Sequence, residues 1–136
     1  MDIKDQVCSL GLSKRLKELG YPQESLWWHW QQYSDKKWIV CQKSKGCSTD
    51  NIISAPSVAE IGMELPYRIK QRWFFRIEKC SHFWRVSYMH NDGEYYVSKK
   101  LELENANITA NTEANARGLM WEYLKKNGLI KEKNDV

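Results

Sequence analysis

The chain has 136 residues, 42% of them hydrophobic and 12% aromatic, and a formal net charge of +4. This length predicts one domain that can bury a core without disulfides or metals. No stretch approaches the roughly 20 consecutive apolar residues of a membrane helix, so no membrane partner is expected.

The first residues and the cysteines favour a cytoplasmic protein. The opening residues, MDIKDQVCSLG, lack the apolar stretch of a signal peptide. The four cysteines include no CxxC pair, so reduced thiols in a cytoplasm are expected. The segment KEKNDV at 131–136 is polar and is predicted to fray.

The first predicted element is a helix over residues 9–20, with Ser9 as its cap and leucines along one face. An aromatic strand follows at 26–33, LWWHWQQY, and SDKK at 34–37 predicts a hairpin turn. The segment WIVCQK at 38–43 is the returning strand.

A second short helix is predicted within 54–66, where Ser57 and Glu60 have the spacing of a capping box. The segment YRIKQRWFFRI at 67–77 then alternates apolar with basic side chains, and this period of two predicts one half-buried strand. The segment HFWRVSYMH at 82–90 predicts the next strand.

After a hairpin turn at NDG, the segment EYYVSKKLELE at 94–104 predicts the last strand. An amphipathic helix follows over 111–128, capped by Asn111 or Thr112. Stripes of apolar residues within 10–19 and 116–124 are expected to pack on the inward side chains of the sheet. These inward side chains are Trp73, Phe75, Trp84, Val86, Tyr95 and Val97.

The predicted fold is therefore α+β, in the order α-β-β-α-β-β-β-α. It consists of an antiparallel sheet of about five strands with helices packed on one face. No linker or repeat divides the chain, so residues 1–130 are predicted to form a single domain.

Three segments together resemble a known group of proteins: SKRLKELGYPQES, ISAPSVAEIGMELP and TEANARGLMWEYLKKNGLI. They are similar to small hypothetical proteins encoded in Bacteroides-type bacterial genomes and in their phages and prophages. The likeness lies in helix caps and amphipathic patterns and includes no catalytic motif. The resemblance implies a mobile-element origin and a cytoplasmic setting, and it implies no site residues.

The sequence offers little for metal or covalent chemistry. The spacings Cys41-x5-Cys47 and Cys80-x-His82 differ from those of zinc sites, so no metal or cofactor is expected. No cation or helix start is evidently placed to activate Cys80. Phosphate loops and nucleophile elbows are missing from the sequence. An enzyme of unknown type is the least favoured hypothesis, and no catalytic residue can be named.

One candidate surface lies on the aromatic strand. Its even positions, Trp28 among them, suit a core, whereas Trp27, His29 and Tyr33 share the opposite, amphipathic face. Tryptophan and tyrosine beside polar groups are typical of interfaces. Either a helix of the same chain covers Trp27, or the face binds another subunit or a protein partner. A ligand slot is a lesser alternative.

A second candidate surface is the outward face of the basic strand. Residues 67–100 carry eight basic and three acidic side chains, so the excess positive charge is concentrated there. The set resembles what single-stranded nucleic acid needs, with cations for phosphates and rings for bases. The alternative is an ordinary solvated sheet face. The candidate residues are Arg68, Lys70, Arg72, Phe74, Arg76, Arg85, Tyr96 and Lys100.

If residues 67–77 form one strand, Arg68, Lys70, Arg72 and Arg76 project along a single line about 25 Å long. The favoured function is nevertheless a small cytoplasmic binding or adaptor module that acts through protein contacts, including self-association. Single-stranded nucleic-acid binding by the basic face is the alternative hypothesis.

Overall fold

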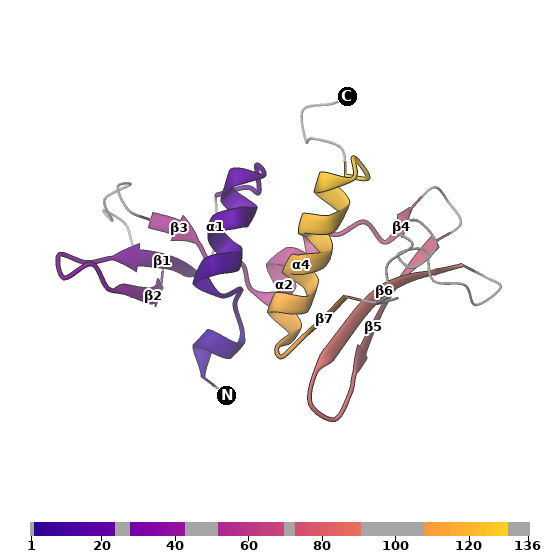
Figure 1. Cartoon of the computed structure of the whole chain (residues 1–136), viewed down its shortest axis with the longest axis horizontal. Coiled ribbons are helices and arrows are strands. Elements are labelled where there is room, and N and C mark those ends of the chain that lie inside the picture. Colours follow the sequence, from indigo (N-terminus) through magenta and orange to yellow (C-terminus); the bar gives the residue numbers. More distant parts are fainter. Residues whose placement is uncertain (1, 24–27, 43–51, 70–72, 91–107, 131–136) are drawn as a thin grey trace.

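The computed structural model describes residues 2–23, 28–42, 52–69, 73–90 and 108–130. In the described part, helices and two antiparallel sheets make up an α+β fold, which confirms the predicted class. The single sheet of about five strands was wrong. The helices lie between a three-stranded and a four-stranded sheet rather than on one face of one sheet (Figure 1).

The three-stranded sheet has the order β2-β1-β3. It consists of β1 (Trp28–Gln32), β2 (Trp38–Gln42) and β3 (Ile52–Ser54). The predicted hairpin is confirmed, and Lys36 in its turn has a φ of 65°. The third strand was missed, because the segment before it has the composition of a loop.

The four-stranded sheet has the order β4-β5-β6-β7. Its strands are β4 (Arg68–Ile69), β5 (Trp73–Lys79), β6 (Trp84–His90) and β7 (Ile108–Ala110). Because Arg68 pairs with Phe74 and Ile69 with Trp73, the chain reverses direction between β4 and β5. The prediction of one continuous strand over 67–77 was therefore wrong. The strand predicted at 94–104 lies outside the described residues.

The helices begin where their caps predicted. In α1 (Leu10–Glu18) the Ser9 side chain accepts a hydrogen bond from the Leu12 backbone N–H. In α2 (Val58–Glu64) the capping box of Ser57 and Glu60 is formed. In α4 (Glu113–Lys126) Thr112 is the N-cap. A short 3₁₀ helix, η1 (Ile3–Asp5), precedes them.

The main core joins the helices to the four-stranded sheet. The α4 helix packs on β6 and β7, while α1 packs on α4 and β3. Trp73, Val86 and Tyr88 are all less than 9% exposed, which confirms the predicted inward register of β5 and β6. Leu12 and Leu16 of α1 belong to this core because α1 packs against α4. The expectation that the leucines of α1 pack directly on the inward side chains of the sheet was wrong.

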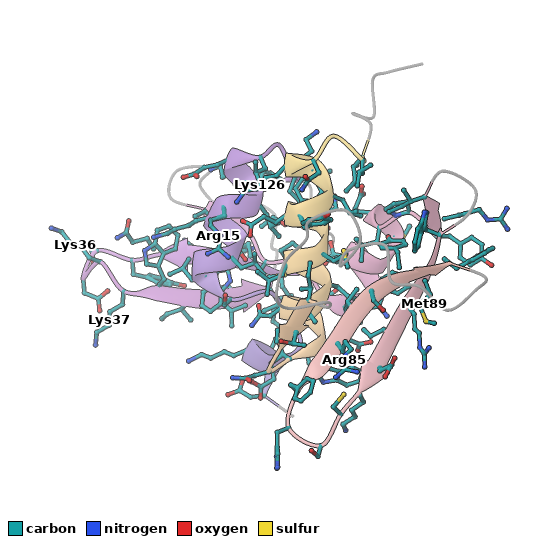
Figure 2. All side chains as sticks on the ribbon, turned by 45° about the vertical axis from the view of Figure 1, so that its right-hand side comes forward. Arg15, Lys36, Lys37, Arg85, Met89 and Lys126 are labelled. Atoms are coloured by element: carbon teal, nitrogen blue, oxygen red, sulfur yellow. The ribbon has the colours of Figure 1, made fainter. Side chains whose placement is uncertain are left out.

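The close approach of α1 to α4 depends on a glycine. A Cβ placed on Gly118 would lie 2.7 Å from Cys8 Sγ and 2.8 Å from Leu12 Cδ2. Glu122, one turn further along α4, accepts a hydrogen bond of 2.8 Å from Arg15 Nε and also lies 3.9 Å from Lys126 Nζ. Figure 2 labels Arg15 on α1 and Lys126 near the end of α4.

A smaller core lies under the three-stranded sheet. Val7, Trp30, Ile53 and Ala55 are buried there. The Trp30 indole N–H donates a hydrogen bond of 3.0 Å to the Cys8 backbone carbonyl, so the indole meets its polar requirement inside the core. This cluster fixes which face of the sheet points inward, and therefore which face is left for function.

Candidate interaction surfaces

The register of the three-stranded sheet defines the face opposite this smaller core. His29 pairs with Cys41 on β2 and with Ser54 on β3, and Gln31 pairs with Ile39. Paired residues point to the same side of a sheet, and successive residues of a strand alternate between its sides. We call this side the open face. It consists of His29, Gln31, Tyr33, Ile39, Cys41, Ile52 and Ser54, of which His29 and Ser54 are each only 4% exposed.

The open face shows two large side chains to solvent. Tyr33 is 45% exposed and Ile39 is 48% exposed. The Tyr33 N–H donates a hydrogen bond to the Lys37 carbonyl just before β2, whereas the Tyr33 hydroxyl lies 3.5 Å from Cys41 Sγ, four residues further on. The tyrosine ring therefore extends along the sheet. Gln31 is half-buried beside them. An aromatic ring and an aliphatic side chain next to polar groups suit a protein contact.

The predicted interface residues divide on this face. Tyr33 is exposed as expected, whereas Trp27 lies outside the described residues. The expectation that His29 is accessible was wrong, because it is only 4% exposed. Its Nε2 lies 3.3 Å from Gln31 Oε1. Sequence reasoning missed Ile39. In the alternation of WIVCQK, Val40 points toward the core, so its neighbour Ile39 points to the other side of the sheet, which is the open face.

The open face also brings the Cys41 thiol, the His29 imidazole and the Ser54 hydroxyl into one row across β2, β1 and β3. However, Cys41 Sγ contacts Tyr33 Oη and the Ile39 carbonyl rather than His29. The thiol therefore lacks a hydrogen-bonded base within the described residues, which nucleophilic catalysis requires. The described part of the chain also contains no group of three His, Cys, Asp or Glu side chains that could hold a metal.

The outward face of the four-stranded sheet has basic residues at one end. The Arg68 guanidinium carbon lies 4.7 Å from the Phe74 ring centroid and 5.8 Å from that of Tyr67. The two rings meet edge to face at 6.2 Å. Tyr67 is 72% exposed, so this cluster of an arginine and two rings is accessible. Sequence reasoning placed Tyr67 in the core, because it treated residues 67–77 as one alternating strand.

Further along this face the positive charges are partly compensated. Glu78 Oε1 lies 2.9 Å from Arg76 Nε, and Glu78 Oε2 lies 3.8 Å from Arg85 Nη1. Two guanidinium groups thus share one carboxylate. The Arg76 Nη1 group also contacts Met89 Sδ at 2.8 Å. Figure 2 labels Arg85 and Met89 on β6. Glu78 lies two residues after Arg76 on β5 and therefore points to the same face. The alternation in the sequence already placed this carboxylate among the basic residues.

The predicted line of four cations is not formed as expected. Arg68 lies on β4, across from Phe74, and Arg76 lies on β5 beyond that pair. The two arginines therefore belong to different strands of a hairpin. Lys70, Arg72, Tyr96 and Lys100, the other members of the predicted nucleic-acid face, lie outside the described residues.

Comparison of the chain with protein-family models, with curated proteins and with solved structures gave no match. Within the described residues, no helix has the length and apolar character needed to cross a membrane.

Proposed function

We propose that this chain is a small binding module that acts through protein contacts made by the open face. The observation that carries the proposal is the pair of exposed side chains there, Tyr33 and Ile39. They lie on the side of the sheet opposite the smaller core that α1 and η1 help to bury. Ile39 lies within β2, and Tyr33 directly follows β1 and is bonded to the Lys37 carbonyl, so the sheet fixes the backbone of both and lowers the entropy cost of ordering a contact surface.

The polar groups around these side chains support a specific rather than a general apolar contact. Gln31 stays half-buried between the strands and offers an amide for hydrogen bonding. Tyrosine offers both a flat ring and a hydroxyl, which makes it frequent among the residues that dominate binding energy. A cytoplasmic location and a mobile-element origin remain predictions that accompany this proposal.

The test compares two substitutions of exposed apolar residues. Tyr33→Ser alters the open face, and Met63→Ser alters α2, where Met63 is 83% exposed. Proteins crosslinked to the full chain in its host cell would be quantified by mass spectrometry for each variant. We expect Tyr33→Ser to reduce the yield of the specific adducts by about tenfold or more, and Met63→Ser to leave it unchanged. Equal yields from both variants would contradict the proposal.

A second candidate function, single-stranded nucleic-acid binding, is favoured by the cluster of Arg68 with Tyr67 and Phe74. An exposed ring beside a guanidinium can stack on a base while the cation meets a phosphate. The shared carboxylate of Glu78 counts against a long phosphate track on the same face. Fluorescence anisotropy with labelled DNA and RNA oligomers at two salt concentrations decides. Binding that weakens with salt and with Tyr67→Ala would support this candidate, and no binding at low salt would remove it.

A further inference from the structure

The two sheets differ in how their edge strands are protected. In the four-stranded sheet the edge strands are short: β4 has two residues and begins with Arg68, and β7 has three. In the three-stranded sheet β3 also has three residues, and the Gln23 side chain accepts a hydrogen bond from the Ser54 backbone N–H. Short edges, charges and covering groups are the usual devices against strand pairing between molecules.

Within the described residues, the remaining edge, on β2, shows fewer of these devices, although the Lys14 ammonium lies 5.0 Å from the Trp38 ring centroid. It is the longest of the described edge strands, with five residues, WIVCQ, that include no charge and no proline. Its composition of β-branched and aromatic residues favours strand pairing. Lys36 and Lys37 lie at the tip of the hairpin, outside the strand itself (Figure 2). Figure 1 shows β2 at the lower border of its sheet.

The hydrogen bonds of the hairpin show which backbone groups of β2 point outward. The Tyr33 N–H donates to the Lys37 carbonyl at 3.0 Å, so Lys37 faces β1. Backbone groups alternate in direction along an antiparallel strand, and Ile39 and Cys41 therefore also face β1. The outward-pointing groups belong to Trp38, Val40 and Gln42.

A bond on the far side of β1 agrees with this assignment. The Trp28 carbonyl accepts a hydrogen bond of 3.1 Å from the Ala55 N–H, which lies toward β3. Trp28 pairs with Gln42, so in this pair the backbone groups point away from each other.

We propose that a second copy of this chain adds its β2 antiparallel to this edge, about a twofold axis at Val40. In that register Val40 pairs with Val40 of the second copy, and Trp38 pairs with Gln42 of the second copy. Each outward N–H then meets an outward carbonyl, which gives about six backbone hydrogen bonds. This inference rests on the proposed function in one respect: both assign a binding role to the three-stranded sheet, and the partner at its β2 edge is a second copy of the chain.

The symmetry of the pairing favours a second copy over another protein. In a dimer with a twofold axis, both molecules use the same surface. One uncharged strand whose outward-pointing backbone N–H and C=O groups alternate is therefore complementary to a second copy of itself. The axis stands perpendicular to the sheet, and the two open faces therefore join on one side. Ile39 would lie opposite Cys41 of the second copy, with Cα atoms about 4.5 Å apart. This contact would cover part of an isoleucine that is 48% exposed in the single chain.

Proline substitutions on β2 test the pairing. Gln42→Pro and Val40→Pro each remove an N–H that points outward, while the ladder to β1 stays formed. Sedimentation equilibrium of the full chain should give twice the chain mass of 16.1 kDa. Each proline variant should raise the dimer dissociation constant by about tenfold or more. Circular dichroism checks the fold, and if Val40→Pro unfolds the chain, Gln42→Pro decides.

The control variant for this experiment is Met63→Ser. Met63 is 83% exposed on α2 rather than on the three-stranded sheet, so this variant should dimerise like the parent chain. A monomeric parent chain at high concentration would overturn the dimer, as would a dimer that both folded proline variants leave unchanged. The open face has a separate test, the loss of crosslinked partners in Tyr33→Ser.

A thiol placed at the seam tests the register. With oxidised glutathione present, Ile39→Cys should form a disulfide with Cys41 of the second copy, and a covalent dimer should appear on a non-reducing gel. Adding Cys41→Ser to that variant should abolish the dimer. Asp35→Cys places an exposed thiol in the turn and should give at least tenfold less dimer. Equal yields from the Ile39→Cys and Asp35→Cys variants would overturn the proposed register.

Discussion

Replacing Gly118 by alanine tests the packing of α1 against α4. The new Cβ would lie within 3.0 Å of two atoms, Cys8 Sγ and Leu12 Cδ2, and both side chains are at most 3% exposed. Neither neighbour can move into solvent, so we expect an overpacking cost in the upper part of the usual range, about 2–3 kcal/mol. The better helix propensity of alanine returns about 1 kcal/mol. The net effect is a loss of about 1–2 kcal/mol in the free energy of unfolding.

The assay is thermal and urea unfolding followed by circular dichroism. For a chain of this size the loss corresponds to a decrease in Tm of about 4–8 °C. Gly11→Ala in α1 is the matched control, because a Cβ there meets nothing within 4 Å. That substitution should leave stability unchanged or raise it by up to about 1 kcal/mol. If Gly118→Ala were as stable as Gly11→Ala, the described contact between the helices would be wrong.

Three further predictions concern buried groups and the basic face. Burial raises the pKa of three weak acids above their ordinary values: Cys8, Tyr21 and Tyr88. The folded state favours the protonated form of each group, so the free energy of unfolding should stay constant below about pH 8. Above pH 10 it should decrease by about 1.4 kcal/mol per pH unit for each group, which urea titrations at several pH values would measure. Trp30→Phe should cost about 0.5–1.5 kcal/mol in unfolding experiments, because it removes one of two donors to the buried Cys8 carbonyl, which keeps the hydrogen bond of 3.3 Å from the Ser13 hydroxyl. Glu78→Gln removes the carboxylate shared by Arg76 and Arg85, so anisotropy should show tighter binding of labelled single-stranded DNA at low salt, with stability changed by less than about 1 kcal/mol.

The local signals in the sequence predicted the local structure well. Ser9, Ser57 and Thr112 cap α1, α2 and α4 because their side chains can accept a backbone hydrogen bond at that position. Alternation in β5 and β6 assigned their inward face, because a period of two leaves only two choices and the apolar set must be buried. These inferences depend on neighbours in sequence.

The errors arose where distant parts of the chain decide the structure. Alternation over 67–77 continues across the reversal between β4 and β5, since Arg68 and Phe74 lie opposite each other and share a face. The pattern therefore could not distinguish one strand from two. The division into two sheets depends on how α1 packs between β3 and α4, which no local pattern encodes. His29 is buried although its strand alternates as predicted. Alternation predicts the side of the sheet to which a side chain points, but it does not predict which other parts of the chain cover that side.

Site-specific photo-crosslinking tests the central claim, that this protein acts through the open face, most directly. A benzophenone amino acid would replace Tyr33 in the full chain, and a control would carry it in place of Met63, which is more exposed but lies on α2. After irradiation in the host cell, we expect discrete covalent protein adducts from position 33, and at most a faint background from position 63. Adducts at equal yield from both positions, or none from position 33, would contradict the claim.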